Sequence, residues 1–342
     1  MNAKFCFIVL LTIIFSKTIK AQNLDASPAG IMISHSHPKG GWMFNYTYMN
    51  MLMKNNLSEI AKISAEEIFT KDYSMAAEKM KMDMHMIMAM YGFTGRLTVM
   101  MMASYNVNSM DMQSYAAGHV HGGANSDGSL FHTHESSGFG DVKLWGLYKI
   151  GNGEGSSLVL SAGINVPTGN INVEAGEHAL FPGQRQSYMM QLGTGSFDLM
   201  PGLTYYKRTG KLSWSTQALL NIRPFENDNG YRQGSDLTFN IWSSYSFSSS
   251  FSASLRGELF NGDVISGKDP MISILAEPDA NPVNHGGIKG NTYAGFNYYL
   301  NKGFLHDTKF GIEFGIPVYQ NVNGIQMSTA YSLFATITKS FN

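Results

Sequence analysis

Methionine occupies every even position from Met80 to Met90, and this alternation constrains the fold more than any other feature of the sequence. Successive side chains of a β-strand point to opposite faces, so a period of two over these eleven residues predicts a strand. A helix would scatter the same six methionines around its circumference. A glycine-containing turn follows at 92–95, and residues 96–107 resume an extended pattern. The two segments therefore predict a β-hairpin with one sulfur-rich face.

The first residues predict an export signal. Lys4 precedes an apolar run over Phe5–Phe15, and a short polar stretch leads to a cleavage point at Ala21–Gln22. The apolar run is too short to cross a bilayer as a helix. Cys6 is the only cysteine, so the mature chain would hold no disulfide. We expect a signal peptide at 1–21, a flexible N-terminal segment at 22–40 and a single β-barrel domain at 41–342.

Charge and hydropathy point to an unusual environment. Removal of Lys4, Lys17 and Lys20 leaves 21 basic and 25 acidic side chains, a net charge of −4, which argues against nucleic acid as a partner. Charged residues make up 14% of the chain, against about 25% in soluble domains. No second apolar stretch approaches the length of a helical span. For an exported chain with these properties we expect an all-β fold, a transmembrane antiparallel β-barrel in the cell outer membrane. In such a barrel polar and apolar residues alternate along each strand, so an averaged hydropathy scale does not reveal the apolar face.

Twelve segments have strand character, and the connections between them alternate in length. Five short turns alternate with six mostly longer loops, as in outer-membrane barrels with short periplasmic turns and long extracellular loops. An even number of strands would leave both termini on the periplasmic side. Within the first loop, the apolar spacing of 57–69 predicts a short helical turn. The predicted strands are 41–53, 79–91, 95–107, 138–150, 156–166, 195–207, 211–223, 236–247, 251–261, 289–300, 308–318 and 325–341.

The strand parity that places apolar side chains toward lipid turns several charged residues toward the lumen. One interpretation is that these charges form ion-pair networks that fill a narrow barrel. The other is that they line a constriction that filters small solutes. Both alternatives stay open at this point. The candidate residues are Arg96, near the periplasmic end, with Asp141, Lys143, Asp198, Arg256, Glu258 and Glu313.

Sixteen of the 23 methionines lie between Met43 and Met112. In the segments 41–53 and 95–107 the alternation directs most methionines inward. The segment 79–91 allows two orientations, because its other face carries Lys81, Asp83 and His85. Either its methionines face lipid as apolar filler, or three neighbouring strands build one thioether wall inside the barrel.

An inward thioether wall would have two uses. Methionine is adaptable enough to accommodate apolar or aromatic solutes. Thioethers also select Cu(I) and similar soft ions such as Ag(I). Three His-x-His pairs, at 35/37, 119/121 and 132/134, are consistent with metal handling. The candidate metal ligands are Met49, Met51, Met53, Met84, Met86, Met88, Met100, Met102, His119, His121, His132 and His134.

A catalytic alternative comes from His134-Glu-Ser136, which is similar to the His-x-Ser site of outer-membrane phospholipase A, another twelve-stranded barrel. That chemistry needs a third polar residue to orient the imidazole. The corresponding position here is Tyr148 rather than the asparagine of that family. Gly151–Gly155 lacks the lysine and the helix of a phosphate-binding loop. We therefore expect no enzymatic activity and no organic cofactor.

Four stretches carry a wider resemblance: Trp42–Met51, Met82–Tyr91, Gly138–Lys149 and Gly195–Tyr205. They resemble the outer-membrane transporter family labelled for the MetA-pathway of phenol degradation. The resemblance implies a barrel that passes small, aromatic or hydrophobic molecules. We thus expect a passive channel or transporter, with outer-membrane lipid, a small-molecule solute and the barrel-assembly machinery as partners. The alternative is a soft-metal binding or tolerance protein.

Overall fold

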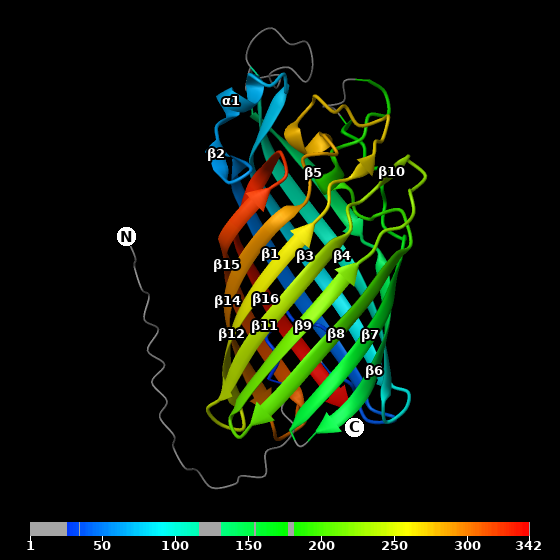
Figure 1. The fold of residues 1–342 in the computed structure, drawn as a ribbon, viewed down its shortest axis with the longest axis vertical. Coiled ribbons are helices and arrows are strands. Elements are labelled where there is room, and N and C mark those ends of the chain that lie inside the picture. The colour runs from blue at the N-terminus through cyan, green and yellow to red at the C-terminus, as the bar shows by residue number, and fades with distance from the viewer. Residues whose placement is uncertain (1–25, 34, 116–130, 154, 177–180, 342) are drawn as a thin grey trace, which may run out of the picture.

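The computed structural model describes residues 26–33, 35–115, 131–153, 155–176 and 181–341. Within these residues, twelve strand paths form one closed antiparallel barrel (Figure 1). Closure comes from β1 (Trp42–Ser58) and β16 (Ile325–Phe341), which pair from Trp42↔Phe341 to Ser58↔Ile325. The other barrel strands are β3 (Met75–Gly92), β4 (Leu97–Ser114), β5 (Phe131–Phe139) with its continuation β6 (Val142–Gly153), β7 (Ser156–Val166), β8 (Asp198–Thr209), β9 (Leu212–Asn221), β11 (Asp236–Ser246), β12 (Phe251–Gly262), β14 (Gly287–Leu300) and β15 (Thr308–Val322).

The predicted fold class and strand number are confirmed. β5 and β6 count as one path, because both pair with β4 in succession and are interrupted only at 140–141. The short turns lie at the end of the barrel that carries the C-terminus, and the long loops lie at the other end (Figure 1). Several strands extend beyond their predicted ends on the loop side. β3 begins at Met75 and β4 continues to Ser114 because these outer segments pair with each other.

The first loop contains a short helix within the segment where a helical turn is predicted. Residues 57–58 extend β1, and β2 (Ala61–Ile63) pairs back onto it. The helix α1 is limited to Ala65–Phe69. A capping box sets its start, because Ser64 Oγ accepts from the Glu67 N–H and the Glu67 carboxylate accepts from the Ser64 N–H.

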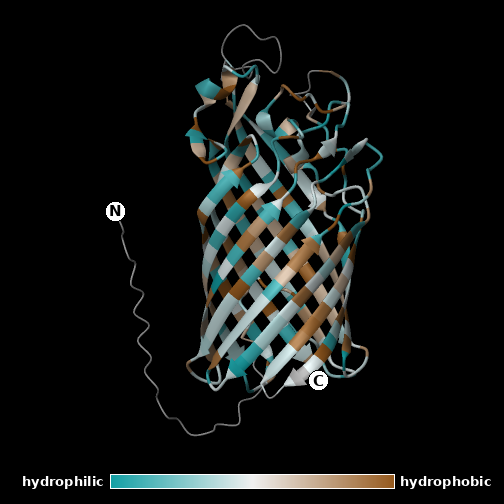
Figure 2. Cartoon of the chain, in the orientation of Figure 1, coloured by the Kyte–Doolittle hydropathy of each residue, from teal (hydrophilic) through white to brown (hydrophobic). Residues whose placement is uncertain are grey.

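Strand alternation separates a lipid-facing surface from a lumen-facing surface. On β1, Trp42 and Phe44 are exposed on the outer face, whereas Met43 and Thr47 are buried inside. Hydrophobic and hydrophilic residues are interspersed along the barrel strands in Figure 2, as expected for strands that present every second residue to lipid. No helix among the described residues has the length and apolar character needed to cross a membrane.

The long loops pack over the outer end of the barrel. They contain the strand pair β10 (Tyr231–Arg232) and β13 (Ser266–Gly267) and the 3₁₀ turns η2 (Tyr188–Met190) and η3 (Pro278–Ala280). Tyr188 and Tyr231 stack edge to face at 4.8 Å within a buried apolar cluster of these loops. Burial raises the pKa of Tyr231 to about 12, so its hydroxyl stays neutral. The loops therefore form a packed cap over the lumen.

Candidate functional site

Residues 26–33, which we name the N-terminal plug, lie inside the barrel. Wall side chains bind its backbone: Ser244 Oγ donates to the Ala26 carbonyl at 2.7 Å, and Asn297 Nδ2 donates to the Ser27 carbonyl at 3.3 Å. Gln217 Nε2 donates to the Ile33 carbonyl. Residues 26–33 belong to the segment 22–40, for which flexibility stays a prediction. Wall donors satisfy the plug's carbonyls, and its small residues allow the backbone to approach the wall.

The tightest contact between plug and wall is at Gly30. Its N–H donates to Glu313 Oε2 at 2.8 Å. A Cβ at this position would lie 2.7 Å from Glu313 Oε2 and 2.7 Å from Arg256 Nη2. Both of these side chains are fixed by their mutual ion pair, so neither can yield easily. Any residue larger than glycine at position 30 would therefore clash with this ion pair.

Three of the predicted lumen residues, Arg256, Glu258 and Glu313, form one network beneath the plug. Arg256 donates twice to Glu313, at 2.9 and 3.1 Å, and once to Glu258 at 2.8 Å. Its guanidinium carbon lies 3.6 Å from the ring centroid of Tyr293, whose hydroxyl donates to Glu258 at 3.0 Å. The side chains of Arg256 and Glu313 are 1% and 0% exposed. This geometry fits the ion-pair interpretation, since each buried charge has a partner.

A second network joins Asp141, Lys143 and Asp198. Asp141 accepts hydrogen bonds from Asn165, from the Gly169 N–H and from Thr194, and so anchors the loop between β7 and β8. Lys143 is half-buried and lies among charges of both signs. The sequence-based selection omitted Arg223, whose side chain joins Asp198 at 3.4 Å to Asp236 at 2.8 Å. Its position on the polar face of the 211–223 segment is the signal that could have identified it.

Arg96 takes no part in either network. It lies in the turn between β3 and β4 and is exposed there. Its backbone carbonyl accepts from the Lys149 N–H at 2.8 Å, which ties the turn to β6.

The methionines of β3 face the lumen, which decides between the two orientations open from the sequence. Met80, Met86, Met88 and Met90 are 0–3% exposed, whereas Ile87 on the opposite face is 64% exposed. Together with the inward methionines of β1 and β4 they line the lumen side of three neighbouring strands. These methionines belong to two buried clusters. The outward Asp83 is stabilised by Lys81 at 2.7 Å and by donors from β1.

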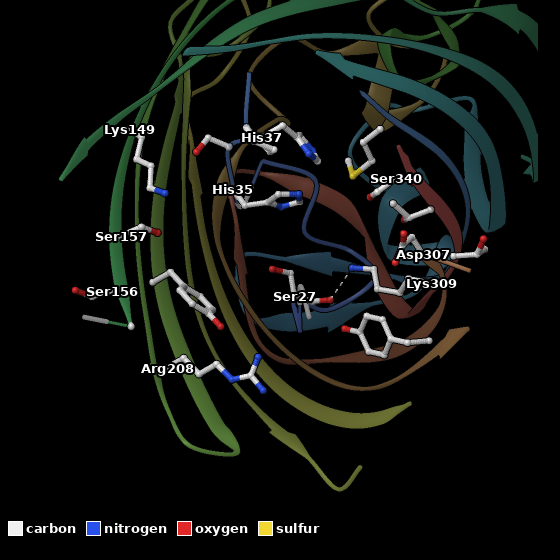
Figure 3. Close-up of a pocket in the computed structure, with 18 of the residues that line it drawn as sticks. Ser27, His35, His37, Lys149, Ser156, Ser157, Arg208, Asp307, Lys309 and Ser340 are labelled. Carbon is white, nitrogen blue, oxygen red and sulfur yellow. Dashed lines mark hydrogen bonds between the residues drawn. The ribbon is translucent and has the colours of Figure 1, made fainter. Parts of the chain in front are cut away.

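The histidine pairs lie at opposite ends of the barrel. His132 and His134 face inward from β5 at the outer end, with ring centroids 5.0 Å apart. His119 and His121 lie outside the described residues. His35 and His37 follow the plug and line a cavity of about 630 Å³ at the short-turn end, together with Lys149, Arg208 and Lys309 (Figure 3).

An apolar hollow of about 890 Å³ lies in the barrel wall across β3, β4, β6, β7 and β8. We name it the wall hollow. Its lining combines lumen-facing residues such as Trp145 and Met200 with lipid-facing residues such as Leu144 and Ile164. Small side chains produce it: Trp145 lies over Gly163, where a Cβ would come within 2.2 Å of the indole.

The catalytic alternative gains little from the geometry. His134 and Ser136 both face the lumen, and Ser136 Oγ accepts from Asn108 Nδ2 at 3.1 Å. Tyr148, the residue at the orienting position, is 44% exposed and points outward near the short-turn end. It cannot orient the imidazole of His134.

The fold defines a closed antiparallel β-barrel of the outer-membrane type. The family model described as "Putative MetA-pathway of phenol degradation" matches residues 104–328, more than half of the chain. The chain belongs to this family. A search of the curated proteins found no match to this chain.

One solved structure shows the same fold at low identity, and two others are reported with it. The COG4313 outer membrane channel from Pseudomonas putida F1 has a TM-score of 0.59 and 14% identity, with 90% of this chain and 97% of that chain covered. A FadL homologue from Pseudomonas aeruginosa has a TM-score of 0.45 and 6% identity, covering 89% and 91%. The P. putida toluene transporter TodX has a TM-score of 0.43 and 10% identity, covering 90% and 91%.

Proposed function

We propose that the protein is a passive, non-enzymatic outer-membrane channel for small apolar or aromatic solutes. The observation that supports this solute class is the wall hollow, whose lining is almost entirely apolar. We further propose that a signal peptide at 1–21 is cleaved after export and that the barrel-assembly machinery inserts the mature chain.

The lumen favours an apolar solute over a polar one near the hollow. Met100, Met200 and Trp145 supply an adaptable, polarisable surface on its inner side. A hydrated solute would lose its water there without gaining hydrogen bonds in return. The plug and the Arg256 network occupy the axial path toward the periplasm. The wall hollow therefore offers such a solute an apolar binding surface beside the blocked axial path.

The test fills the hollow from its lipid side. Ala162→Trp places an indole in the hollow, whereas Ala294→Trp places the same side chain on the outer face of β14, away from the hollow. Purified barrels in liposomes would take up a small naphthalene probe. We expect Ala162→Trp to slow uptake several-fold and Ala294→Trp to match wild type. Equal uptake by both variants, or no uptake above empty liposomes by wild type, would contradict the proposal.

A further inference from the structure

The methionines between Met43 and Met112 are sorted almost completely by face. Fifteen of the sixteen belong to, or pack against, the two lumen-side clusters, and only Met101 faces lipid, with 53% of its surface exposed. The lipid-facing positions of the same strands use other apolar residues, such as Trp42, Ile87 and Val99. Apolar filling alone does not require this sorting, since leucine or valine would serve on either face.

One row of this wall places four soft ligands on four successive strands. The register pairs Met53 of β1 with Met80 of β3, Met80 with Met110 of β4, and Met110 with His134 of β5. All four side chains face inward and are 0–4% exposed. We name this set the outer row. Side chains on directly opposite residues have Cβ atoms about 4.5–5.5 Å apart, so neighbouring thioethers can converge on one ion.

Further sulfur and nitrogen atoms surround the outer row. Met112 and His132 are paired one step further out. Met190 of η2 and Met327 of β16 pack against the same cluster, and loop residue Ala276 helps to enclose it. No group of three or more His, Cys, Asp or Glu residues with metal-site geometry occurs in the described part of the chain. The ligands gathered here are thus thioethers and imidazoles rather than the oxygen ligands of hard cations.

We propose that the outer row is a binding site for a soft monovalent cation, Cu(I) or Ag(I). Thioether and imidazole ligands favour Cu(I), whereas Mg²⁺ and Ca²⁺ require oxygen ligands. Coordination by thioethers of adjacent strands and by the His134 imidazole offsets the cost of placing a charge in a buried apolar cluster. This site is independent of the apolar solute proposed above, because the wall hollow lies at the other cluster of methionines.

A second row supplies an internal comparison. Met43, Met90 and Met100 are aligned on the same three strands near the plug, and the fourth partner there is Trp145 in place of a histidine. We name this set the plug-side row. It has the same number of thioethers and similar burial but lacks the imidazole. The proposal therefore predicts that the first soft ion occupies the outer row.

The experiment is a titration of the mature barrel in detergent with Ag(I), followed by calorimetry and by NMR of [methyl-13C]methionine. The test variant is Met53→Leu/Met80→Leu/Met110→Leu, which approximately conserves volume. The matched variant is Met43→Leu/Met90→Leu/Met100→Leu, and Met101→Leu is the lipid-face control. Heat-dependent mobility in detergent gels verifies that each barrel is folded. His134→Gln provides a single substitution that leaves all the thioethers in place.

We expect wild type, Met101→Leu and the plug-side variant to bind the first Ag(I) with similar affinity. Removing a residue that only hydrogen-bonds to a metal ligand already weakens metal affinity about 10- to 100-fold. The outer-row variant and His134→Gln lose ligands themselves, so their affinity for Ag(I) should fall at least about tenfold. The shifted methyl signals should be those missing in the outer-row variant. Unchanged affinity in the outer-row variant, loss only in the plug-side variant, or no Ag(I) binding by wild type would each overturn the proposal.

Discussion

The contact between Gly30 and the Arg256–Glu313 pair predicts that a single methyl group will loosen the plug. In Gly30→Ala the new Cβ would lie 2.7 Å from both Glu313 Oε2 and Arg256 Nη2. The carboxylate and guanidinium are 0% and 1% exposed and are joined by two hydrogen bonds. Separation of that pair would leave buried charges less well compensated, so the plug is the partner that moves.

The structure gives a magnitude for this change. When the plug moves, it loses the Gly30 N–H hydrogen bond to a carboxylate, which is 2.8 Å long. A hydrogen bond to a charged group contributes about 1.5–3 kcal/mol. Since about 1.4 kcal/mol corresponds to a factor of ten, the population of the displaced plug should rise about 10- to 150-fold.

Single-channel recording in planar bilayers measures this population as the fraction of time spent in a conducting state. Gly95→Ala is the matched control, because a Cβ at Gly95 meets nothing within 4 Å. We expect Gly30→Ala to open far more often than either wild type or the control. Open fractions that are the same for Gly30→Ala and Gly95→Ala would refute the argument that the Arg256 network holds the plug in place.

Two further predictions concern the loops. Asp141→Ala removes the acceptor of the Gly169 and Thr194 N–H groups, at 2.8 and 2.9 Å, and should destabilise the loop between β7 and β8 by about 1–3 kcal/mol per orphaned donor. Trypsin should then cleave this loop faster at Arg185. Asp141→Asn keeps an acceptor and should show a smaller effect. Burial first, and Asp279 second, raise the pKa of Glu277 to about 8. Because the folded loop retains this proton, its stability should be greatest below pH 4.5 and should fall as pH rises toward 8. Protease resistance of the 263–286 loop should fall with rising pH in wild type and should fall less in Glu277→Gln.

The barrel itself could be predicted because strand alternation is a local property of the chain. Leu212, Trp214 and Leu220 all lie on the outer face, as their spacing predicts. The alternation of short turns and long loops likewise fixed the number of strands. The ends of β3 and β4 were missed, because their outer segments gain strand structure only by pairing with each other.

The sequence determined that one face of the 79–91 strand is sulfur-rich, and that charged residues at 141, 198, 256 and 313 point away from lipid. It did not decide which way the methionines turn, because both faces of that strand tolerate either environment. Only closure of β1, β3 and β4 into register set them inward and aligned Met53, Met80, Met110 and His134 in one row. The N-terminal plug also required the tertiary structure. Its segment has no periodicity, and its position depends on hydrogen bonds to strands more than 170 residues away, such as those from Gln217, Ser244 and Asn297. Partners at such separations become neighbours only when the barrel closes.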